Sequence, residues 1–281
     1  MRRIIILLLS GLMLYSFCFA AVPIPVNLKA PSSTYVSQIK KRGYLRVGLY
    51  GQNYPPFVMY DKSHKPYGLD VELAKQIAEY LGVAVKFDTS VEYYIDLNNH
   101  VAQEKYDIAL SGVFMTPERA EVVNFSTPYM KTNTVLVTNR VAAIKHVSSP
   151  HVYTSFNNPK IKLGILKYSE FELLAKDYFP KAKEARVENV TDLFHQVATG
   201  KLTAMLVSAI EARYFIAHNP QFALSTEVLP ISNATNLVSI MSSYGHPRFN
   251  VWLNTVVALL DANHVAEDLS QQYFVVKKDG Q

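Results

Sequence analysis

Arg119 is the residue of this sequence best placed to bind a carboxylate. It follows Thr116-Pro117, a pair typical of a helix start, because threonine caps a helix N-terminus and proline fits the first helical position. A cation in the first turn is unfavourable by a few tenths to about 1 kcal/mol, so we expect a neighbouring anion. The planar guanidinium matches the two oxygens of a carboxylate. That carboxylate belongs either to a ligand or to the protein, where Glu118 and Glu121 are the candidates on the helix surface.

Groups on two loops can complete a ligand site around this arginine. Ser111-Gly112 follows the apolar run Tyr106–Leu110 and lets another molecule approach backbone N–H groups. Tyr54 and Phe57 flank two prolines after an earlier strand-like segment. They form either a flat wall against an apolar or cationic part of a ligand, or simply part of the core at the edge of a lobe.

Two serine and glutamate pairs are the candidates in the second half of the chain. Ser169 precedes Glu172 with the spacing of a capping box, so we expect it to cap a helix, beside which free N–H groups can also bind an anion. Ser208 and Glu211 follow another apolar, strand-like run. Glu211 either faces a ligand, pairs with Arg213 or caps the next helix.

Signatures of metal or hydrolase chemistry are weak in this sequence. The eight histidines form no spacing typical of metal ligands, and neither a Ser-His-Asp arrangement nor a G-x-S-x-G motif is evident. We therefore expect no metal and no organic cofactor.

Strand-like and helical segments alternate through the first part of the chain. The strand-like segments are Tyr44–Tyr50, Val83–Phe87 and Tyr106–Leu110, with helical patterns between them. This order predicts a parallel sheet covered by helices, and such sheets bind ligands beyond the carboxyl ends of their strands. The loops that carry Tyr54 and Ser111 should therefore open on the same crevice.

A second unit of similar layout follows, and two extended segments join it to the first. Thr132–Thr138 leads into the second unit, and Leu237–Met241 returns from it. We expect an α/β clamshell, in which each of two lobes is a mainly parallel sheet covered by helices and two hinge strands connect the lobes. Lobe 1 should comprise residues 35–137 plus 238–281, and lobe 2 residues 138–237.

The first 20 residues have the pattern of a cleavable secretory signal peptide. Two arginines precede a short apolar run that ends in small residues, which favours cleavage after Ala20 over an uncleaved anchor or lipidation at Cys18. Residues 21–34, rich in proline and small residues, should form a flexible leader. Because Cys18 is the single cysteine, the exported chain would contain no disulfide.

The charge of the chain argues against a nucleic acid partner. Its formal net charge of +5 falls to +3 without Arg2 and Arg3, and no basic run with interleaved aromatic residues occurs. No second apolar run approaches membrane-spanning length. We therefore expect a free exported protein.

Three segments in order carry a resemblance to a known family: GYLRVGLYGQNYPPFVMY, YGLDVELAKQIAEYLG and YDIALSGVFMTPERAEVVNFSTPY. The chain resembles the bacterial extracellular solute-binding proteins of family 3, the periplasmic receptors of polar amino acid transporters, from about Val36 to Phe274. The resemblance implies a hinged two-lobe periplasmic binding protein fold, ligand capture by closure of a monomer and docking on an inner-membrane ABC permease.

The resemblance also implies roles for particular residues. Tyr54 corresponds to an aromatic lid, Ser111 and Gly112 to ligand contacts, and Arg119 to the α-carboxylate ligand. The loop Lys167–Glu170 corresponds to the contact from lobe 2. Its candidate ligand-binding residues are Tyr168, Ser169 and Glu170.

Two departures from the family pattern concern the ligand. Phe114 stands where threonine or serine is common, which places a ring in the pocket. Ser208 stands where an aspartate typically holds the ligand amino group. A buried ammonium needs a counter-charge, and Glu211 is the nearest candidate. The family implies a small, amino-acid-like carboxylate as ligand.

A different activity is the alternative. The segments VENVTDLF and SAIEARYFIAHNPQF look like the corresponding part of periplasmic cyclohexadienyl dehydratases, which share this fold and make phenylpyruvate from prephenate. In such a lyase Glu211 would act as general acid. Ser208, in place of an aspartate, and the loop LKYSE, in place of Asn-Pro-Gly-Gly-Thr, depart from those enzymes.

Overall fold

The computed structural model describes residues 34–145 and 151–274. The signal peptide expected over residues 1–20 lies outside the described residues, as does the leader apart from Thr34. Within the described ranges, no helix combines the length and apolar character needed to cross a bilayer.

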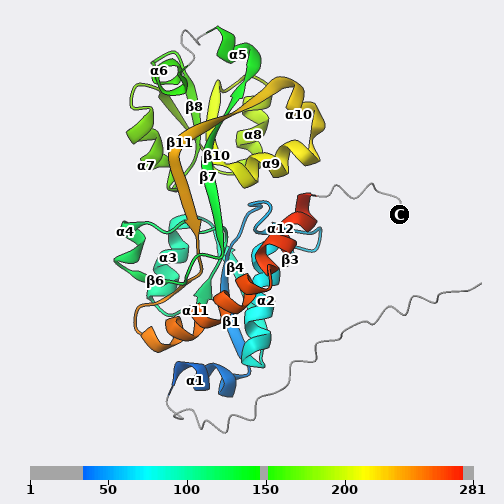
Figure 1. The fold of residues 1–281 in the computed structure, drawn as a ribbon, viewed down its shortest axis with the longest axis vertical. Helices are drawn as coiled ribbons and strands as arrows, with labels where there is room; N and C mark the ends of the chain where they lie inside the picture. Colours follow the sequence, from blue (N-terminus) through cyan, green and yellow to red (C-terminus); the bar gives the residue numbers. More distant parts are fainter. Residues whose placement is uncertain (1–33, 146–150, 275–281) are drawn as a thin grey trace, which may run out of the picture.

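Lobe 1, the lower part of the molecule in Figure 1, is built on a five-stranded sheet in the order β4-β1-β5-β12-β6. Its strands are β1 (Tyr44–Tyr50), β4 (Ala84–Val91), β5 (Ile108–Ala109), β6 (Val123–Phe125) and β12 (Met241–Ser243). β1 is parallel to β4 and β5, whereas β12 is antiparallel to both β5 and β6. Four strands therefore point one way, as predicted for a mainly parallel sheet.

Helices and a small hairpin complete lobe 1. They are α1 (Tyr35–Arg42), α2 (Leu69–Leu81), α3 (Tyr94–Ala102), α4 (Pro117–Ala120), α11 (Pro247–Ala262), α12 (Val265–Phe274) and the hairpin strands β2 (Met59–Tyr60) and β3 (Pro66–Tyr67). α2 shows why these segments are helical, because its apolar side chains recur on one face and Leu73, Ile77 and Leu81 are buried there.

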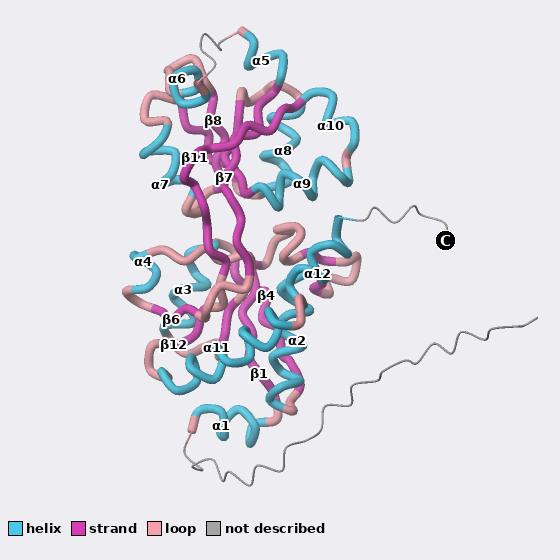
Figure 2. Tube along the Cα trace, in the orientation of Figure 1, coloured by secondary structure: helices cyan, strands magenta, loops and turns pink. Residues whose placement is uncertain are grey.

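Lobe 2, the upper part of the molecule in Figure 2, repeats this plan with the strand order β11-β7-β10-β8-β9. Its strands are β7 (Met130–Asn139), β8 (Lys162–Leu166), β9 (Lys183–Val187), β10 (Ala204–Ser208) and β11 (Thr226–Val238). Its helices are α5 (Arg140–Ile144), α6 (Val152–Phe156), α7 (Phe171–Tyr178), α8 (Val190–Ala198), α9 (Ala209–His218) and α10 (Pro220–Ser225). β10 is parallel to β8, which is parallel to β9, whereas β7 runs against β10 and β11. The central strand β10 is buried along its whole length.

The antiparallel pair β7 and β11 runs from one lobe into the other (Figures 1 and 2). At its lobe 1 end, β11 is hydrogen-bonded to the loop that precedes α4. The Met115 N–H donates to Leu237 O at 2.9 Å, and the Ser239 N–H donates to Val113 O at 2.9 Å. The hinge is thus bonded directly to the segment that leads to Arg119.

The predicted α/β clamshell with two hinge strands is confirmed, and most differences concern element ends. β5 is shorter than the predicted Tyr106–Leu110, and the predicted last strand, Leu237–Met241, is divided between the end of β11 and the start of β12. β11 begins at Thr226, a start that Pro230 obscures in the sequence because proline is unfavourable inside a sheet. The lobe bounds 35–137 plus 238–281 and 138–237 stay a prediction.

Candidate functional site

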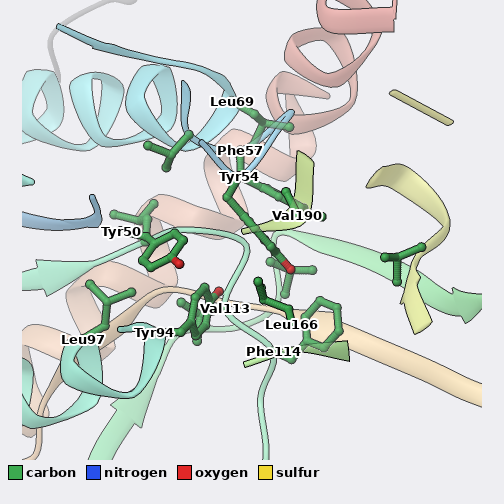
Figure 3. Packing of buried hydrophobic residues seen from close by; sticks show 14 of the residues in the cluster. Tyr50, Tyr54, Phe57, Leu69, Tyr94, Leu97, Val113, Phe114, Leu166 and Val190 are labelled. Carbon is green, nitrogen blue, oxygen red and sulfur yellow. The ribbon is translucent and has the colours of Figure 1, made fainter. Parts of the chain in front are cut away.

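Side chains of the two lobes meet in this structure, so the cleft between the lobes is closed. The Tyr50 hydroxyl donates to Glu188 O at 3.3 Å across the cleft. The rings of Phe114 and Phe171 pack edge to face, with centroids 5.8 Å apart. Figure 3 shows Tyr54, Tyr94 and Phe114 of lobe 1 together with Leu166 and Val190 of lobe 2, all of which belong to one contiguous core.

Arg119 lies in this closed interface and is only 7% exposed. Its backbone N–H donates to the Thr116 side chain at 3.2 Å, which confirms the predicted cap, and Pro117 is the first residue of α4. The guanidinium donates from Nη1 to Phe114 O at 2.8 Å and from Nη2 to Glu170 Oε2 at 3.0 Å. The compensating anion within the protein is therefore Glu170 of lobe 2, and no ion pair of Arg119 with Glu118 or Glu121 is formed.

Glu170 reaches Arg119 from the start of α7, and Ser169 does not cap that helix. The prediction of a capping box at Ser169 is wrong. The Ser169 Oγ donates to Leu166 O at 2.6 Å. The N-cap residue of α7 is Glu170, whose side chain makes no capping hydrogen bond. Tyr168 has φ 59°, which turns the chain so that its N–H donates to Glu172 Oε1 at 2.8 Å. The side chains of Ser169 and Glu172, which the capping-box spacing assigns to the start of α7, are therefore bonded to backbone groups of the preceding turn instead.

Ser111 and Gly112 are occupied by hydrogen bonds within lobe 1. Ser111 Oγ accepts from the Tyr50 N–H at 2.9 Å, and the Ser111 carbonyl accepts from the Tyr94 hydroxyl. The Gly112 N–H donates to Asp70 Oδ2 at 2.6 Å. These bonds fix the loop beside Arg119, and both residues remain candidate ligand contacts.

Asp70 supports this loop and was not identified from the sequence. It is fully buried in the first turn of α2, where it accepts from Gly112 and, at 2.7 Å, from the Tyr129 hydroxyl. Burial raises the pKa of its carboxyl to about 7, while both hydrogen bonds oppose the rise. The sequence signal that could have identified Asp70 is an acidic residue between two apolar ones, Leu69 and Val71, both of which are buried.

Glu211 is fully buried on the lobe 2 side of the site and caps α9. Ser208 Oγ accepts from the Glu211 N–H at 3.3 Å, and Glu211 Oε2 accepts from the Ser208 N–H at 2.9 Å. This reciprocal arrangement is a capping box, so the cap alternative is confirmed. Glu211 forms no ion pair with Arg213, whose guanidinium instead lies 4.1 Å from the centre of the Phe274 ring.

The second carboxyl oxygen of Glu211, Oε1, is not used by the capping box and can interact with a ligand. Oε1 is buried and has no hydrogen-bond partner among the described residues. Burial raises the pKa of the carboxyl to about 7, the hydrogen bonds from Ser208 lower it, and the charge of Glu170 raises it further. The hydroxyl of Tyr54 faces the same carboxyl from lobe 1. Glu211 can therefore accept a cationic donor, or donate a proton near neutral pH.

The aromatic candidates take different places around the cleft. Tyr54 is 1% exposed and stacks on Phe57, with centroids 5.9 Å apart. Phe57 is fully buried below Gly112, so it lies in the core of lobe 1. Tyr168 lies at the rim, 45% exposed, with its ring 5.0 Å from that of Tyr93 across the cleft.

Two pockets of the described surface lie beside this closed cluster. One, of about 540 Å³, is at the mouth of the cleft, between the loop 51–53 and the start of α8. The other, of about 530 Å³, lies between β7, α9 and α12. Neither contains Arg119 or Glu211, because side chains of the two lobes fill the space around those residues.

The fold and the buried arginine between lobes can be compared with known proteins. The sequence model of the family described as bacterial extracellular solute-binding proteins, family 3, matches residues 45–276 of this chain. The chain belongs to this family. Family 3 proteins are extracellular or periplasmic, and the match confirms the resemblance found in the sequence.

Three similar proteins illustrate the range of the family. ABC transporter arginine-binding protein 1 of Escherichia coli is 23% identical over 79% of this chain and 87% of that protein. Cyclohexadienyl dehydratase of Pseudomonas aeruginosa is 31% identical over 66% of this chain and 67% of the enzyme. The crystal structure of an ancestral amino acid-binding protein, described as a precursor of cyclohexadienyl dehydratase, has a TM-score of 0.74 and 28% identity. It covers 86% of this chain and 100% of that one.

Proposed function

We propose that the protein is a periplasmic receptor that captures a small, amino-acid-like carboxylate between its lobes for uptake through an inner-membrane ABC permease. The single observation that carries this proposal is the environment of Arg119. Its guanidinium is buried between the lobes and already binds a carboxylate, that of Glu170, at 3.0 Å. A ligand carboxylate entering the open cleft would take the same donors.

The amino group of such a ligand finds acceptors across the cleft. The family aspartate is replaced by Ser208, which carries no charge, but Glu211 adjoins it and has one oxygen without a partner among the described residues. A buried ammonium beside a carboxylate avoids the cost of an uncompensated charge. Tyr54 and Phe114 would line the space between the two ends of the ligand.

The comparisons support this function in its broad form. The related Escherichia coli protein is named as arginine-binding, and the similar ancestral structure is described as amino acid-binding. Export by a cleaved signal peptide, a monomeric state and a cognate permease belong to the same proposal. The ligand contacts that we propose are Tyr54, Ser111, Gly112, Phe114, Arg119, Tyr168, Ser169, Glu170, Ser208 and Glu211. Phe57, in the core of lobe 1, supports the Tyr54 ring on which it stacks.

Thermal unfolding of the purified protein with single amino acids and organic acids tests this function. A ligand raises the midpoint of unfolding as its concentration exceeds its Kd. Arg119→Ala should abolish the shift, because truncating one partner of a buried, hydrogen-bonded charge pair costs about 2–5 kcal/mol of binding. Arg186→Ala is the matched control, since Arg186 is half exposed and, within the described part of the chain, forms its ion pairs with Glu172 and Glu184 of lobe 2. Equal affinity in the Arg119→Ala variant and the parent would overturn the carboxylate anchor.

A dehydratase-like lyase is the second candidate, and the state of Glu211 favours it. A buried carboxyl with a pKa of about 7 suits a general acid at neutral pH. In this reaction Glu211 would protonate the leaving hydroxyl of prephenate. Loss of water and of the ring carboxylate as carbon dioxide would then give the aromatic ring of phenylpyruvate.

Turnover separates the two candidates. Prephenate is added to the purified protein and phenylpyruvate is followed by its absorbance. Turnover that disappears in Glu211→Gln would support the lyase and overturn the uptake function. A ligand that stabilises the protein while prephenate is not consumed would support the receptor.

A further inference from the structure

Arg119 is bonded in this structure to a carboxylate of the protein itself. Its Nη2 donates to Glu170 Oε2 at 3.0 Å, and the side chains of both residues are only 8% exposed. Its Nη1 donates to Phe114 O at 2.8 Å. The guanidinium comes from lobe 1 and the carboxylate from lobe 2, so the pair forms only when the lobes meet. An acidic side chain of one lobe therefore occupies the group that should anchor a ligand carboxylate.

The carboxylate of Glu170 is not needed to build the turn from which it extends. Other side chains hold that turn. Ser169 Oγ donates to Leu166 O at 2.6 Å. Glu172 Oε1 accepts from the Tyr168 N–H at 2.8 Å. Glu170 stands at the N-cap position of α7, but its side chain makes no capping hydrogen bond. Its carboxylate thus serves the contact across the cleft, and replacing it leaves the bonds of the turn in place.

The closed site has no room for a second carboxylate on the guanidinium. Neither the pocket at the mouth of the cleft nor the one beside α12 includes Arg119, because side chains of both lobes fill the space around it. One guanidinium also neutralises only one of two carboxylates, and a second one held nearby in a desolvated space repels the first. On the proposed receptor function, a ligand carboxylate therefore binds Arg119 only after Glu170 has left it.

We propose that Glu170 is an internal competitor of the ligand: its carboxylate takes the ligand's place on Arg119 and so sets the affinity of the site. This inference rests on the proposed receptor function. Every ligand must replace an ion pair that the protein already makes. Its apparent affinity is lowered accordingly, because only protein in which the pair is broken can bind it. A residue that merely contacts the ligand would have the opposite effect when replaced, because its loss weakens binding.

Acetate tests directly whether Glu170 occupies the anchor. In Glu170→Ala the guanidinium loses its partner, and added sodium acetate should bind there in roughly the millimolar range. It should raise the midpoint of thermal unfolding of this variant more than sodium chloride or acetamide does at the same concentration. The parent should bind acetate at least about tenfold more weakly, because Glu170 holds the site. The double variant Arg119→Ala/Glu170→Ala should lose the effect.

Glu188→Ala is the control for the loss of a carboxylate elsewhere in the cleft. Glu188 lies at the rim with its side chain 69% exposed, and it pairs with Lys167 at 3.3 Å. This variant should respond to acetate as the parent does. Acetate that stabilises Glu170→Ala no more than the parent, or that still acts on the double variant, would overturn the inference.

Amino acid binding tests the competition itself. The standard amino acids are titrated calorimetrically into the parent and into Glu170→Gln, which keeps the shape of the side chain without its charge. Those that bind should do so about 5- to 150-fold more tightly in the variant, whereas Glu188→Gln should leave every affinity unchanged. Affinities that are equal or weaker in Glu170→Gln than in the parent would overturn the inference.

The two tests separate this inference from the receptor function. Binding of no amino acid by the parent or by Glu170→Gln would overturn the receptor function, while the acetate result would still decide whether Glu170 occupies the anchor. Amino acid binding that Glu170→Gln does not strengthen would leave the receptor function standing and remove the role of Glu170 as a competitor.

Discussion

The ion pair between Arg119 and Glu170 should stabilise the closed conformation, and Glu170→Gln tests this because it removes the charge and keeps an acceptor. The charges are 3.0 Å apart and their side chains are 8% exposed. At an effective dielectric constant of about 20, two such charges attract by roughly 5–6 kcal/mol. Desolvation of both ions offsets much of this, so we expect a net loss of about 1–3 kcal/mol. The ratio of closed to open protein should fall roughly 5- to 150-fold.

Small-angle scattering and an interlobe distance measurement report this shift. Labels on cysteines engineered into α1 and α5, at opposite ends of the molecule in Figure 1, follow the bending of the hinge. The variant should have a larger radius of gyration and a broader distance distribution than the parent. Glu188→Gln removes an exposed interaction worth well under 1 kcal/mol and should change neither. Identical scattering and distances in Glu170→Gln and the parent would refute the role of the pair.

Two further predictions concern pH and packing. Since the pKa of Glu211 is raised to about 7 from 4.5, the folded protein binds more protons than the unfolded chain between these values, and stability should fall as pH rises through this window. Glu211→Gln should remove roughly 3 kcal/mol of this loss, measured by urea unfolding at pH 4.5 and pH 8, and parallel pH profiles would contradict it. Gly112→Ala should destabilise the protein by about 1–3 kcal/mol in the same assay, because a Cβ would lie 2.6 Å from the Phe57 ring at φ 62°. Gly43→Ala, with φ 81° and open space around the Cβ, measures the backbone cost alone, and an equal loss there would show that the contact with Phe57 is unimportant.

The fold follows from sequence because its signals are local. Alternating apolar runs and helical periodicity mark the strands and helices of both lobes, and β-branched residues mark the crossing at β7. Element ends are less certain, since they depend on which neighbours a strand pairs with. β11 is an example, because its pairing with β7 continues past Pro230 through an irregular register.

The site was predictable where chemistry is local and not where it depends on the lobes meeting. Thr116 and Pro117 mark the position of Arg119, but its partner Glu170 lies 51 residues further along the chain and reaches it only through closure. Local spacing also misleads, because the S-x-x-E pattern occurs at both Ser169 and Ser208 and forms a capping box only at Ser208. The turn at Tyr168, with its positive φ, decides between them.

The bonds between the hinge and the anchor loop extend the control of affinity beyond the residues that touch a ligand. Leu237 and Ser239 of the returning chain hold Met115 and Val113, immediately before the helix that carries Arg119. A change in the backbone at this end of the hinge can therefore be passed on to the loop that positions the guanidinium. Substitutions in this part of the hinge can change the affinity for a ligand and its dissociation rate without replacing any residue that contacts the ligand.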